Sequence, residues 1–186
     1  MRVVSGEVGG RRLVAPPGRA TRPTSDRARE AVFAALGSLG AVQGARVLDL
    51  FAGSGALGIE ALSRGADHAT FVDDDRTARA TVERNLAACG LAARAEVVAS
   101  DARRFLDQRD GPWGLVLVDP PYAFDDWDGL LRAVAARMAP DGVVVAESDR
   151  DVTVPAPLGL ARARRYGSTV VTFARLPGDP IPGDAT

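Results

Sequence analysis

Three glycines follow a largely apolar stretch in a spacing that fits a nucleotide. Gly53, Gly55 and Gly58 form a G-x-G-x-x-G pattern after residues 47–50 and open a helical pattern. Glycine permits a tight turn there and lets a ligand lie against the backbone. Asp73 ends the next apolar stretch, where a carboxylate can accept hydrogen bonds from ribose hydroxyl groups. The arrangement predicts a site for an adenosine-bearing cofactor; the alternative is a tight turn that binds nothing.

Two further features argue against a nicotinamide cofactor. Asp49 lies just before the glycine loop, where it would repel a pyrophosphate and attract a cationic amino-acid group. The tetrapeptide Asp119-Pro120-Pro121-Tyr122 ends another apolar stretch. In an open α/β sheet, ligands bind outside the carboxyl ends of the strands, near the switch between strands 1 and 4. We therefore expect residues 119–122 beside the glycine loop, although the tetrapeptide alone could be a simple proline turn.

Alternating strand and helix patterns supply the elements that must position these residues. Their rhythm indicates a doubly wound α/β fold with a mostly parallel sheet. Two further strands without a long helix between them, 151–156 and 167–175, predict an antiparallel C-terminal edge and seven strands in all. The other strands are expected at 46–51, 69–73, 94–99, 114–119 and 142–147, and helices at 55–64, 76–88, 102–108 and 127–138.

The two ends of the chain differ from this central domain, which we place at residues 24–176. Residues 1–23 are predicted to form a basic β-hairpin, turning at Gly9-Gly10, and a loop. A helix is expected to follow and to end near Leu39. Residues 177–186 are rich in proline and glycine and are expected to be disordered.

The composition is that of one globular domain. The chain has 186 residues, 46% of them hydrophobic, and its single cysteine, Cys89, excludes a disulfide framework and a cysteine-rich zinc site. No apolar run reaches the roughly 18–20 residues of a membrane span. The first residues also lack an apolar signal-peptide core. We expect a cytoplasmic monomer that does not bind membranes.

All 23 basic residues are arginine, and they are unevenly distributed. Residues 1–30 carry a net charge of +4 and residues 162–186 one of +2, whereas the stretch between them carries −7. Basic ends on an acidic body indicate an anionic partner at the ends. The alternative is a solvated surface with no partner.

The glycine loop and the Asp-Pro-Pro-Tyr tetrapeptide together resemble the S-adenosylmethionine-dependent methyltransferases that modify exocyclic or amide nitrogens. A more specific resemblance is carried by residues 2–13, the RPT…RE…F pattern of residues 22–33, residues 48–66 and the YG-T pattern of residues 166–169. These segments resemble one family in particular, the bacterial 16S rRNA (guanine(966)-N2)-methyltransferases called RsmD. One residue departs from that family, because Ala34 follows Phe33 where an asparagine is usual. Any hydrogen bond from that asparagine is absent here.

The resemblance implies a Rossmann-like class I methyltransferase fold, S-adenosylmethionine as cofactor, S-adenosylhomocysteine as product and no metal. Asp119 and the carbonyl of Pro120 would hold the guanine N2 amino group, with Pro121 in the same motif and Tyr122 stacked on the extruded base. The substrate would be 16S rRNA, alone or within an assembling small ribosomal subunit. The implied cofactor-binding residues are Asp49, Phe51, Gly53, Gly55, Asp73, Asp101, Ala102 and Phe33, and the implied RNA-binding residues are Arg2, Arg11, Arg12, Arg19 and Arg22.

Other functions use similar motifs. DNA adenine-N6 and protein glutamine methyltransferases also carry an Asp/Asn-Pro-Pro-Tyr/Phe motif, although 186 residues leave little room for a DNA target-recognition domain. A non-catalytic RNA-binding module is a different class of function that the arginines alone would fit. Single residues have structural alternatives as well: Asp101 could cap a helix, and Tyr122 and Phe33 could be core aromatic residues.

Overall fold

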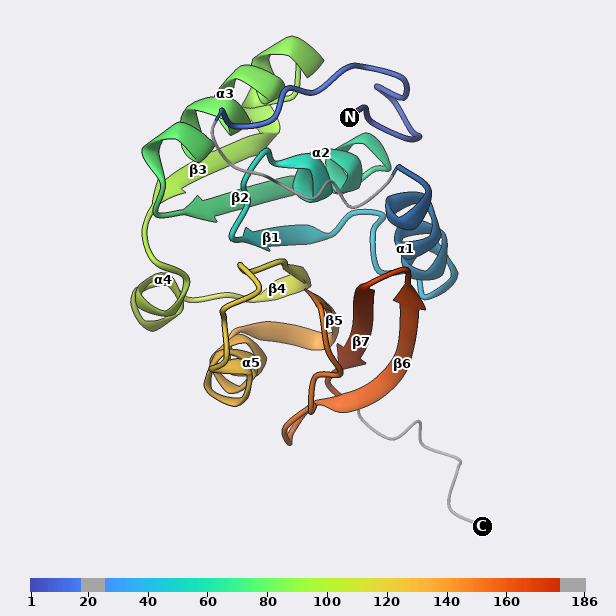
Figure 1. The fold of residues 1–186 in the computed structure, drawn as a ribbon, viewed down its shortest axis with the longest axis vertical. Helices are drawn as coiled ribbons and strands as arrows, with labels where there is room; N and C mark the ends of the chain where they lie inside the picture. Colours follow the sequence, from blue (N-terminus) through green and yellow to red (C-terminus); the bar gives the residue numbers. More distant parts are fainter. Residues whose placement is uncertain (18–25, 178–186) are drawn as a thin grey trace.

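The computed structural model describes residues 1–17 and 26–177, and its centre is a seven-stranded sheet (Figure 1). The strands are β1 (Arg46–Leu50), β2 (His68–Asp73), β3 (Ala95–Ala99), β4 (Trp113–Val118), β5 (Met138–Ser148), β6 (Gly159–Tyr166) and β7 (Thr169–Arg175). They lie in the order β3-β2-β1-β4-β5-β7-β6. The first five in this order are parallel, whereas β7 is antiparallel to β5 and β6 is antiparallel to β7. This topology confirms the predicted α/β fold.

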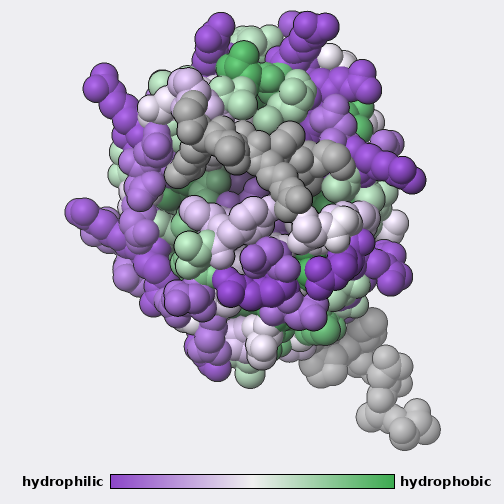
Figure 2. Space-filling view, viewed as in Figure 1, coloured by the Kyte–Doolittle hydropathy of each residue, from purple (hydrophilic) through white to green (hydrophobic). Residues whose placement is uncertain are grey.

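Helices cover both faces of the sheet. Helices α1 (Asp26–Ser38), α2 (Ala56–Ser63) and α3 (Arg76–Cys89) pack on one face, and α4 (Ala102–Gln108) and α5 (Trp127–Ala135) on the other. Along β4, Leu115 and Leu117 belong to the first core and Val116 and Val118 to the second. A strand buried on both faces needs a continuous apolar run, which is why the central strands were predictable. Hydrophilic side chains project around the periphery (Figure 2).

The C-terminal edge of the sheet corrects one prediction. Residues 151–156 form no strand, and the remaining strand is β6 instead. Residues 159–165 of β6 are all exposed, so the strand carries no apolar pattern. Its sheet pairing is with β7, at the end of the strand order. The antiparallel edge therefore consists of two strands, of which only β7 packs in the core.

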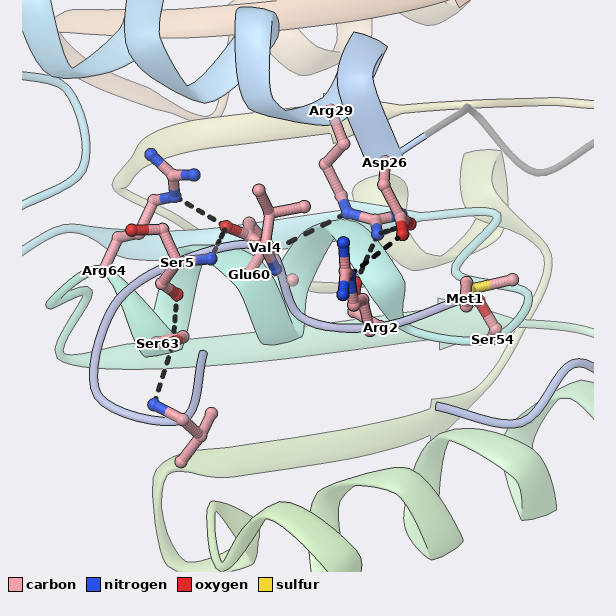
Figure 3. A network of polar contacts seen from close by, with 12 residues as sticks. Met1, Arg2, Val4, Ser5, Asp26, Arg29, Ser54, Glu60, Ser63 and Arg64 are labelled. Carbon is pink, nitrogen blue, oxygen red and sulfur yellow. Dashed lines mark hydrogen bonds and ion pairs between the residues drawn. The ribbon is translucent and has the colours of Figure 1, made fainter. Parts of the chain in front are cut away.

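Residues 1–17, hereafter the N-terminal arm, double back along α2 but do not form the predicted β-hairpin (Figure 3). Within the described residues, one isolated bridge between Arg2 and Arg12 and three backbone hydrogen bonds join the two halves of the arm. Several backbone N–H groups in the bend donate to α2 instead. Val4 and Ser5 donate to the carboxylate of Glu60, at 2.6 and 3.1 Å, so these groups are not available for a regular strand pair.

A buried ionic network fastens the arm between α1 and α2 (Figure 3). Glu60, fully buried, accepts a hydrogen bond from Arg64 Nε at 2.7 Å and lies 3.7 Å from Arg29 Nε. The guanidinium of Arg29 donates to the Arg2 carbonyl at 2.5 Å and to Asp26 at 2.7 Å. Two helices thus hold the main chain of the arm by charge-assisted hydrogen bonds.

Both ends of the arm lie beside the glycine loop. The Ser54 hydroxyl donates to Met1 Sδ at 3.4 Å. Asn85 of α3 donates from Nδ2 to the carbonyls of Val14 (3.0 Å) and Ser54 (2.8 Å), and its Oδ1 accepts from the Val14 N–H at 2.9 Å. One buried amide therefore connects the arm with the loop between β1 and α2.

Among the described residues, no helix is long and apolar enough to cross a membrane. In the same part of the chain, no group of three His, Cys, Asp or Glu side chains is arranged to hold a metal ion. The predicted tail lies outside the described residues from residue 178 onward.

Candidate functional site

The glycine loop between β1 and α2 depends on two left-handed glycines and one close contact. Gly53 and Gly55 have φ values of +56° and +75°, a region that side chains with a Cβ rarely adopt. Gly58 lies in the first turn of α2, where an added Cβ would be 2.4 Å from the Phe71 ring and 3.0 Å from Asp49 Oδ2. The third glycine of the pattern therefore lets the helix approach the sheet.

Asp49 is a buried carboxylate beneath this helix. It is 2% exposed, and its Oδ2 accepts a hydrogen bond from the Gly58 N–H at 2.9 Å. The pKa of Asp49 is raised to about 8, mainly by burial and also by the carboxylates of Asp73 and Glu147, against the lowering effect of the Gly58 N–H. A cation placed here would relieve the cost of ionising Asp49.

Asp73, at the end of β2, supports the glycine loop directly. Its Oδ2 accepts from the Gly53 N–H at 2.8 Å and its Oδ1 from the Asp75 N–H at 2.9 Å. A carboxylate oxygen has two lone pairs, so Asp73 can still accept hydrogen bonds from hydroxyl groups of a ligand. The two bonds fix the orientation of the carboxylate at the carboxyl end of the sheet.

The tetrapeptide of residues 119–122 follows β4 immediately beside the glycine loop. Leu50 of β1 pairs with Val118 of β4, so the two strands end together. The ring of Phe51, which has φ +61°, meets the Phe124 ring edge-on at 5.6 Å between centroids. Strand pairing and an aromatic contact thus bring together the two motifs that the sequence predicted to be adjacent.

Within the tetrapeptide, each side chain has a different environment. Pro120 is buried, whereas Tyr122 is 48% exposed. Asp119 retains solvent access, yet enough protein surrounds its carboxylate that desolvation raises its pKa well above the ordinary value. Glu147 and Asp49 raise it further. Arg150 donates to the carbonyl of Tyr122 at 3.0 Å, which anchors the loop after the motif.

Glu147 is a site residue that the sequence reasoning missed. It is 2% exposed near the end of β5, and the next residue pair after Val118–Ala146 in the β4–β5 register is Asp119–Glu147. The signal was present, because a carboxylate interrupts the apolar run of residues 143–146. Burying a carboxylate costs free energy, so a buried acid at a strand end beside a ligand site indicates a functional residue.

Asp101 and Ala102 lie at the neighbouring strand end, after β3. Asp101 is exposed, and its Oδ1 accepts from the backbone N–H groups of Arg103 and Arg104 at 2.9 and 3.1 Å, which makes it the cap of α4. These bonds leave Oδ2 for a ligand. Ala102, the first residue of α4, is buried.

Phe33 is not brought to this group of residues. It is buried on α1, and the guanidinium of Arg64, just after the C-terminal end of α2, lies 5.3 Å from its ring centroid. The glycine loop is at the opposite end of α2, about 12 Å away along the helix axis. The structure thus gives Phe33 a packing role against Arg64.

Three of the five predicted RNA-binding arginines lie on the arm, and all three are exposed. Arg2 lies 3.5 Å from Asp26, and Arg11 donates to the Ala88 carbonyl at the end of α3 at 3.2 Å. No hydrogen bond or ion pair between described residues involves the Arg12 guanidinium. Arg19 and Arg22 lie outside the described residues.

The residues at the carboxyl edge fit S-adenosylmethionine. The cofactor has a ribose, an adenine amino group, a cationic amino-acid end and a sulfonium. The chain offers acceptors for the first two in Asp73 and Asp101 and a buried, proton-holding carboxylate in Asp49. An acidic edge suits a cation and disfavours a pyrophosphate.

Comparison with known proteins agrees with this chemistry. The family described as "Conserved hypothetical protein 95" matches residues 1–175. YlbH of Bacillus subtilis (strain 168) is 41% identical over 186 residues, which cover 96% of this chain and all of that protein. "Ribosomal RNA small subunit methyltransferase D" of Escherichia coli (strain K12) is 37% identical over 172 residues, or 90% of this chain and 85% of that protein.

Solved structures show the same relationship. YhhF from Escherichia coli is 35% identical and superposes with a TM-score of 0.85 over 96% of this chain and 99% of that one. SMU.776, solved in complex with SAH, is 17% identical with a TM-score of 0.62 over 73% of this chain and 46% of that one, and shares the fold alone. With the family matched over nearly all its length and a carboxyl edge suited to the cofactor, the chain belongs to the RsmD/YlbH family of S-adenosylmethionine-dependent rRNA methyltransferases.

Proposed function

We propose that this protein transfers a methyl group from S-adenosylmethionine to the exocyclic N2 of a guanine in small-subunit rRNA. The observation that supports this most strongly is the convergence of Asp73, Asp49 and Asp119 at the ends of β2, β1 and β4, three neighbouring strands, with the glycine loop among them. The first two carboxylates suit the cofactor, and the third begins the motif associated with amino-group methylation.

The cofactor residues have separable roles in this proposal. Bound S-adenosylmethionine would supply an electrophilic methyl group on a positively charged sulfur. Asp73 accepts hydrogen bonds from the ribose hydroxyls, Asp101 Oδ2 accepts from the adenine amino group next to Ala102, and Asp49 pairs with the amino-acid ammonium. Gly53 and Gly55 keep side chains away from the cofactor, and Phe51 borders it on the side of the Phe124 ring.

The methyl acceptor is held by the tetrapeptide. Asp119 and the carbonyl of Pro120 each accept one N–H of the guanine amino group, which turns the nitrogen lone pair toward the methyl carbon. The nitrogen forms a bond to carbon as the carbon–sulfur bond breaks, its electron pair remaining on sulfur. The nitrogen then loses one proton, to Asp119 or to water. Tyr122, half exposed beside the buried Pro120, stacks on the extruded base, and Pro121 links them.

The arm supplies the RNA contact in this proposal. Arg2, Arg11 and Arg12 are exposed on a segment whose main chain is fastened to α1 and α2. Phosphate contacts from such a segment orient the RNA without reading its sequence. Arg12 is the strongest candidate, because its guanidinium is not engaged by the described residues. The proposed substrate, 16S rRNA in an assembling small subunit, implies action in the cytoplasm.

One experiment tests substrate and chemistry together. The protein is incubated with radiolabelled S-adenosylmethionine and either small ribosomal subunits or deproteinised rRNA from cells lacking this gene, and the RNA is digested to nucleosides. We expect label in N2-methylguanosine. Cofactor binding without label in either RNA would redirect the search to DNA or protein amides, and label in another nucleoside would refute the guanine assignment.

A further inference from the structure

The exposed edge strand β6 carries three arginines outside the site described above. Arg162, Arg164 and Arg165 lie in a strand whose residues 159–165 are all exposed. Between described residues, none of the three guanidinium groups takes part in a hydrogen bond or ion pair. In the acidic stretch after β5, Asp149 lies 3.4 Å from Arg150, which partly neutralises it. The strand therefore presents uncompensated positive charge.

The register of the sheet aligns these arginines with the methyl-transfer motif. Glu147 of β5 pairs with Val171 of β7, and Val171 pairs with Arg164 of β6. Asp119 is the next residue after the last β4–β5 pair, on the other side of Glu147. Because neighbouring strands are about 4.8 Å apart, the backbones of Arg164 and Asp119 are about 14 Å apart along one row.

The arginine-bearing half of β6 also lies at the correct edge of the sheet. β5 and β6 are both antiparallel to β7, so they run in the same direction. The end of β6 therefore lies at the edge where the parallel strands end and where Asp49, Asp73 and Asp119 lie. At the other end of β6 the exposed side chain is apolar, since Leu160 is 61% exposed.

Two of the three arginines, Arg162 and Arg164, share one face of the sheet with the N-terminal arm, whereas Arg165 projects to the other face. Arg162 and Arg164 pair directly with Phe173 and Val171, both in the core that α1, α2 and α3 cover. Directly paired residues of neighbouring strands project to the same face. The arm packs along α2 on that face, so Arg162 and Arg164 extend toward the same side as the arm.

We propose that β6 is a second RNA-contact surface, on which Arg162 and Arg164 bind phosphates that flank the target nucleotide. This inference rests on the proposed function. A base extruded toward Asp119 leaves its neighbouring phosphates outside, and a guanidinium about 14 Å away along the same edge can contact them. The arm and β6 would then hold the RNA on both sides of the extruded base.

A protective role for the same arginines makes a different prediction. Charged side chains on an edge strand block pairing with another sheet edge. If protection were their only role, neutralising them would promote association of the protein with itself and leave RNA affinity unchanged. If they contact phosphate, neutralisation lowers RNA affinity and reduces its salt dependence.

The test compares Arg162→Gln/Arg164→Gln with a control variant that loses the same charge elsewhere, Arg84→Gln/Arg175→Gln. Arg84 is exposed on α3, and Arg175 ends β7 at the opposite edge of the sheet. Binding to small subunits from cells lacking this gene is measured between 0.05 and 0.3 M salt. For two phosphate contacts we expect about tenfold weaker binding near 0.15 M and a log–log slope smaller by about 1.4.

Three further measurements separate the outcomes. Arg162→Lys/Arg164→Lys keeps the charge and should retain most of the slope, which also covers the case in which the glutamine variant does not fold. Affinity for S-adenosylmethionine should not change in any variant. Equal losses in the control, or self-association in size-exclusion chromatography with unchanged RNA affinity, would overturn the proposal. Wild-type protein that binds the cofactor but not subunits would instead refute the proposed function.

Discussion

Asp119 and Glu147 follow the last residue pair of β4 and β5, so they lie side by side in the register of the sheet. Asp49 of β1 projects to the same face, because it pairs with Leu117, two residues before Asp119. Three carboxylates therefore gather where three parallel strands end. The charges of Glu147 and Asp49 raise the pKa of Asp119, and the positive charges of S-adenosylmethionine would lower it.

Replacing Glu147 by glutamine should shift the pH dependence of methylation. The charge of Glu147 raises the pKa of Asp119, so its removal should lower that pKa. If catalysis needs the Asp119 carboxylate, the rise of rate with pH should move to lower pH in Glu147→Gln. Single-turnover rates measured across pH would show this. Glu96, which is partly buried on β3 and pairs with Arg109, provides a control, since Glu96→Gln should leave the profile in place. An unshifted profile in Glu147→Gln would exclude coupling between the two carboxylates.

Asp119→Ala should separate chemistry from cofactor binding. It removes one preorganised acceptor at the reacting nitrogen, a loss that we expect to reduce turnover by roughly 10²-fold or more. Affinity for S-adenosylmethionine should stay within a few-fold, because Asp49 and Asp73 are unchanged. Calorimetric binding and methylation rates on the same sample make the comparison. An equal loss of cofactor affinity would assign Asp119 to the cofactor rather than to the base.

Asp49 makes the stability of the free protein depend on pH. Its pKa of about 8 in the folded state exceeds its ordinary value of 3.8, so the folded state binds more protons than the unfolded state between these values. The free energy of unfolding should therefore fall as pH rises through this window, by at most about 1.4 kcal/mol per pH unit. In Asp49→Asn this contribution is absent, so the variant should gain stability over wild type from pH 5 to pH 8 in urea unfolding. A constant difference would mean that Asp49 is ionised throughout.

Glu60→Ala should both destabilise the protein and release the arm. Removing one partner of a buried ionic network costs about 3–5 kcal/mol, because Arg29 and Arg64 lose their carboxylate. The amides of Val4 and Ser5 lose their acceptor as well, so their hydrogen exchange should accelerate beyond that of the sheet. Glu83→Ala, on the exposed side of α3, should do neither. Protected arm amides in Glu60→Ala would show that other contacts suffice.

Gly58→Ala should weaken the site through packing alone. The added Cβ would lie 2.4 Å from the Phe71 ring, so α2 must move away from the sheet. The Gly58 N–H moves with the helix, which weakens the hydrogen bond that it donates to Asp49. We expect lower thermal stability and weaker S-adenosylmethionine binding. Gly37→Ala on α1, where an added Cβ meets nothing within 4 Å, should instead stabilise by about 0.5–1 kcal/mol. Wild-type affinity in Gly58→Ala would mean that the helix can shift without disturbing the loop.

The sequence predicted the parts of the fold that leave a pattern in consecutive residues, such as an apolar run or a glycine motif. Central strands such as β4 are apolar on both faces, and the pairing of β1 with β4 follows from the doubly wound pattern, so the adjacency of the two motifs could be anticipated. The course of the arm could not be anticipated, because the N–H groups of Val4 and Ser5 donate hydrogen bonds to Glu60, more than 50 residues away on α2. The sequence did not predict β6, because neither face of this strand is buried and it therefore has no apolar pattern.

The hydrogen bonds of the Asn85 amide affect how the binding of one ligand influences the binding of another. One side chain braces the arm at Val14 and the glycine loop at Ser54. Any ligand that steadies one of these segments therefore lowers the entropic cost of ordering the other. Thermodynamic reciprocity then requires that cofactor and RNA alter each other's affinity by the same factor, whichever arrives first. Under the proposed function, in which the arm contacts RNA, a single asparagine would thus couple the binding of two different ligands at opposite ends of one short hydrogen-bonded link.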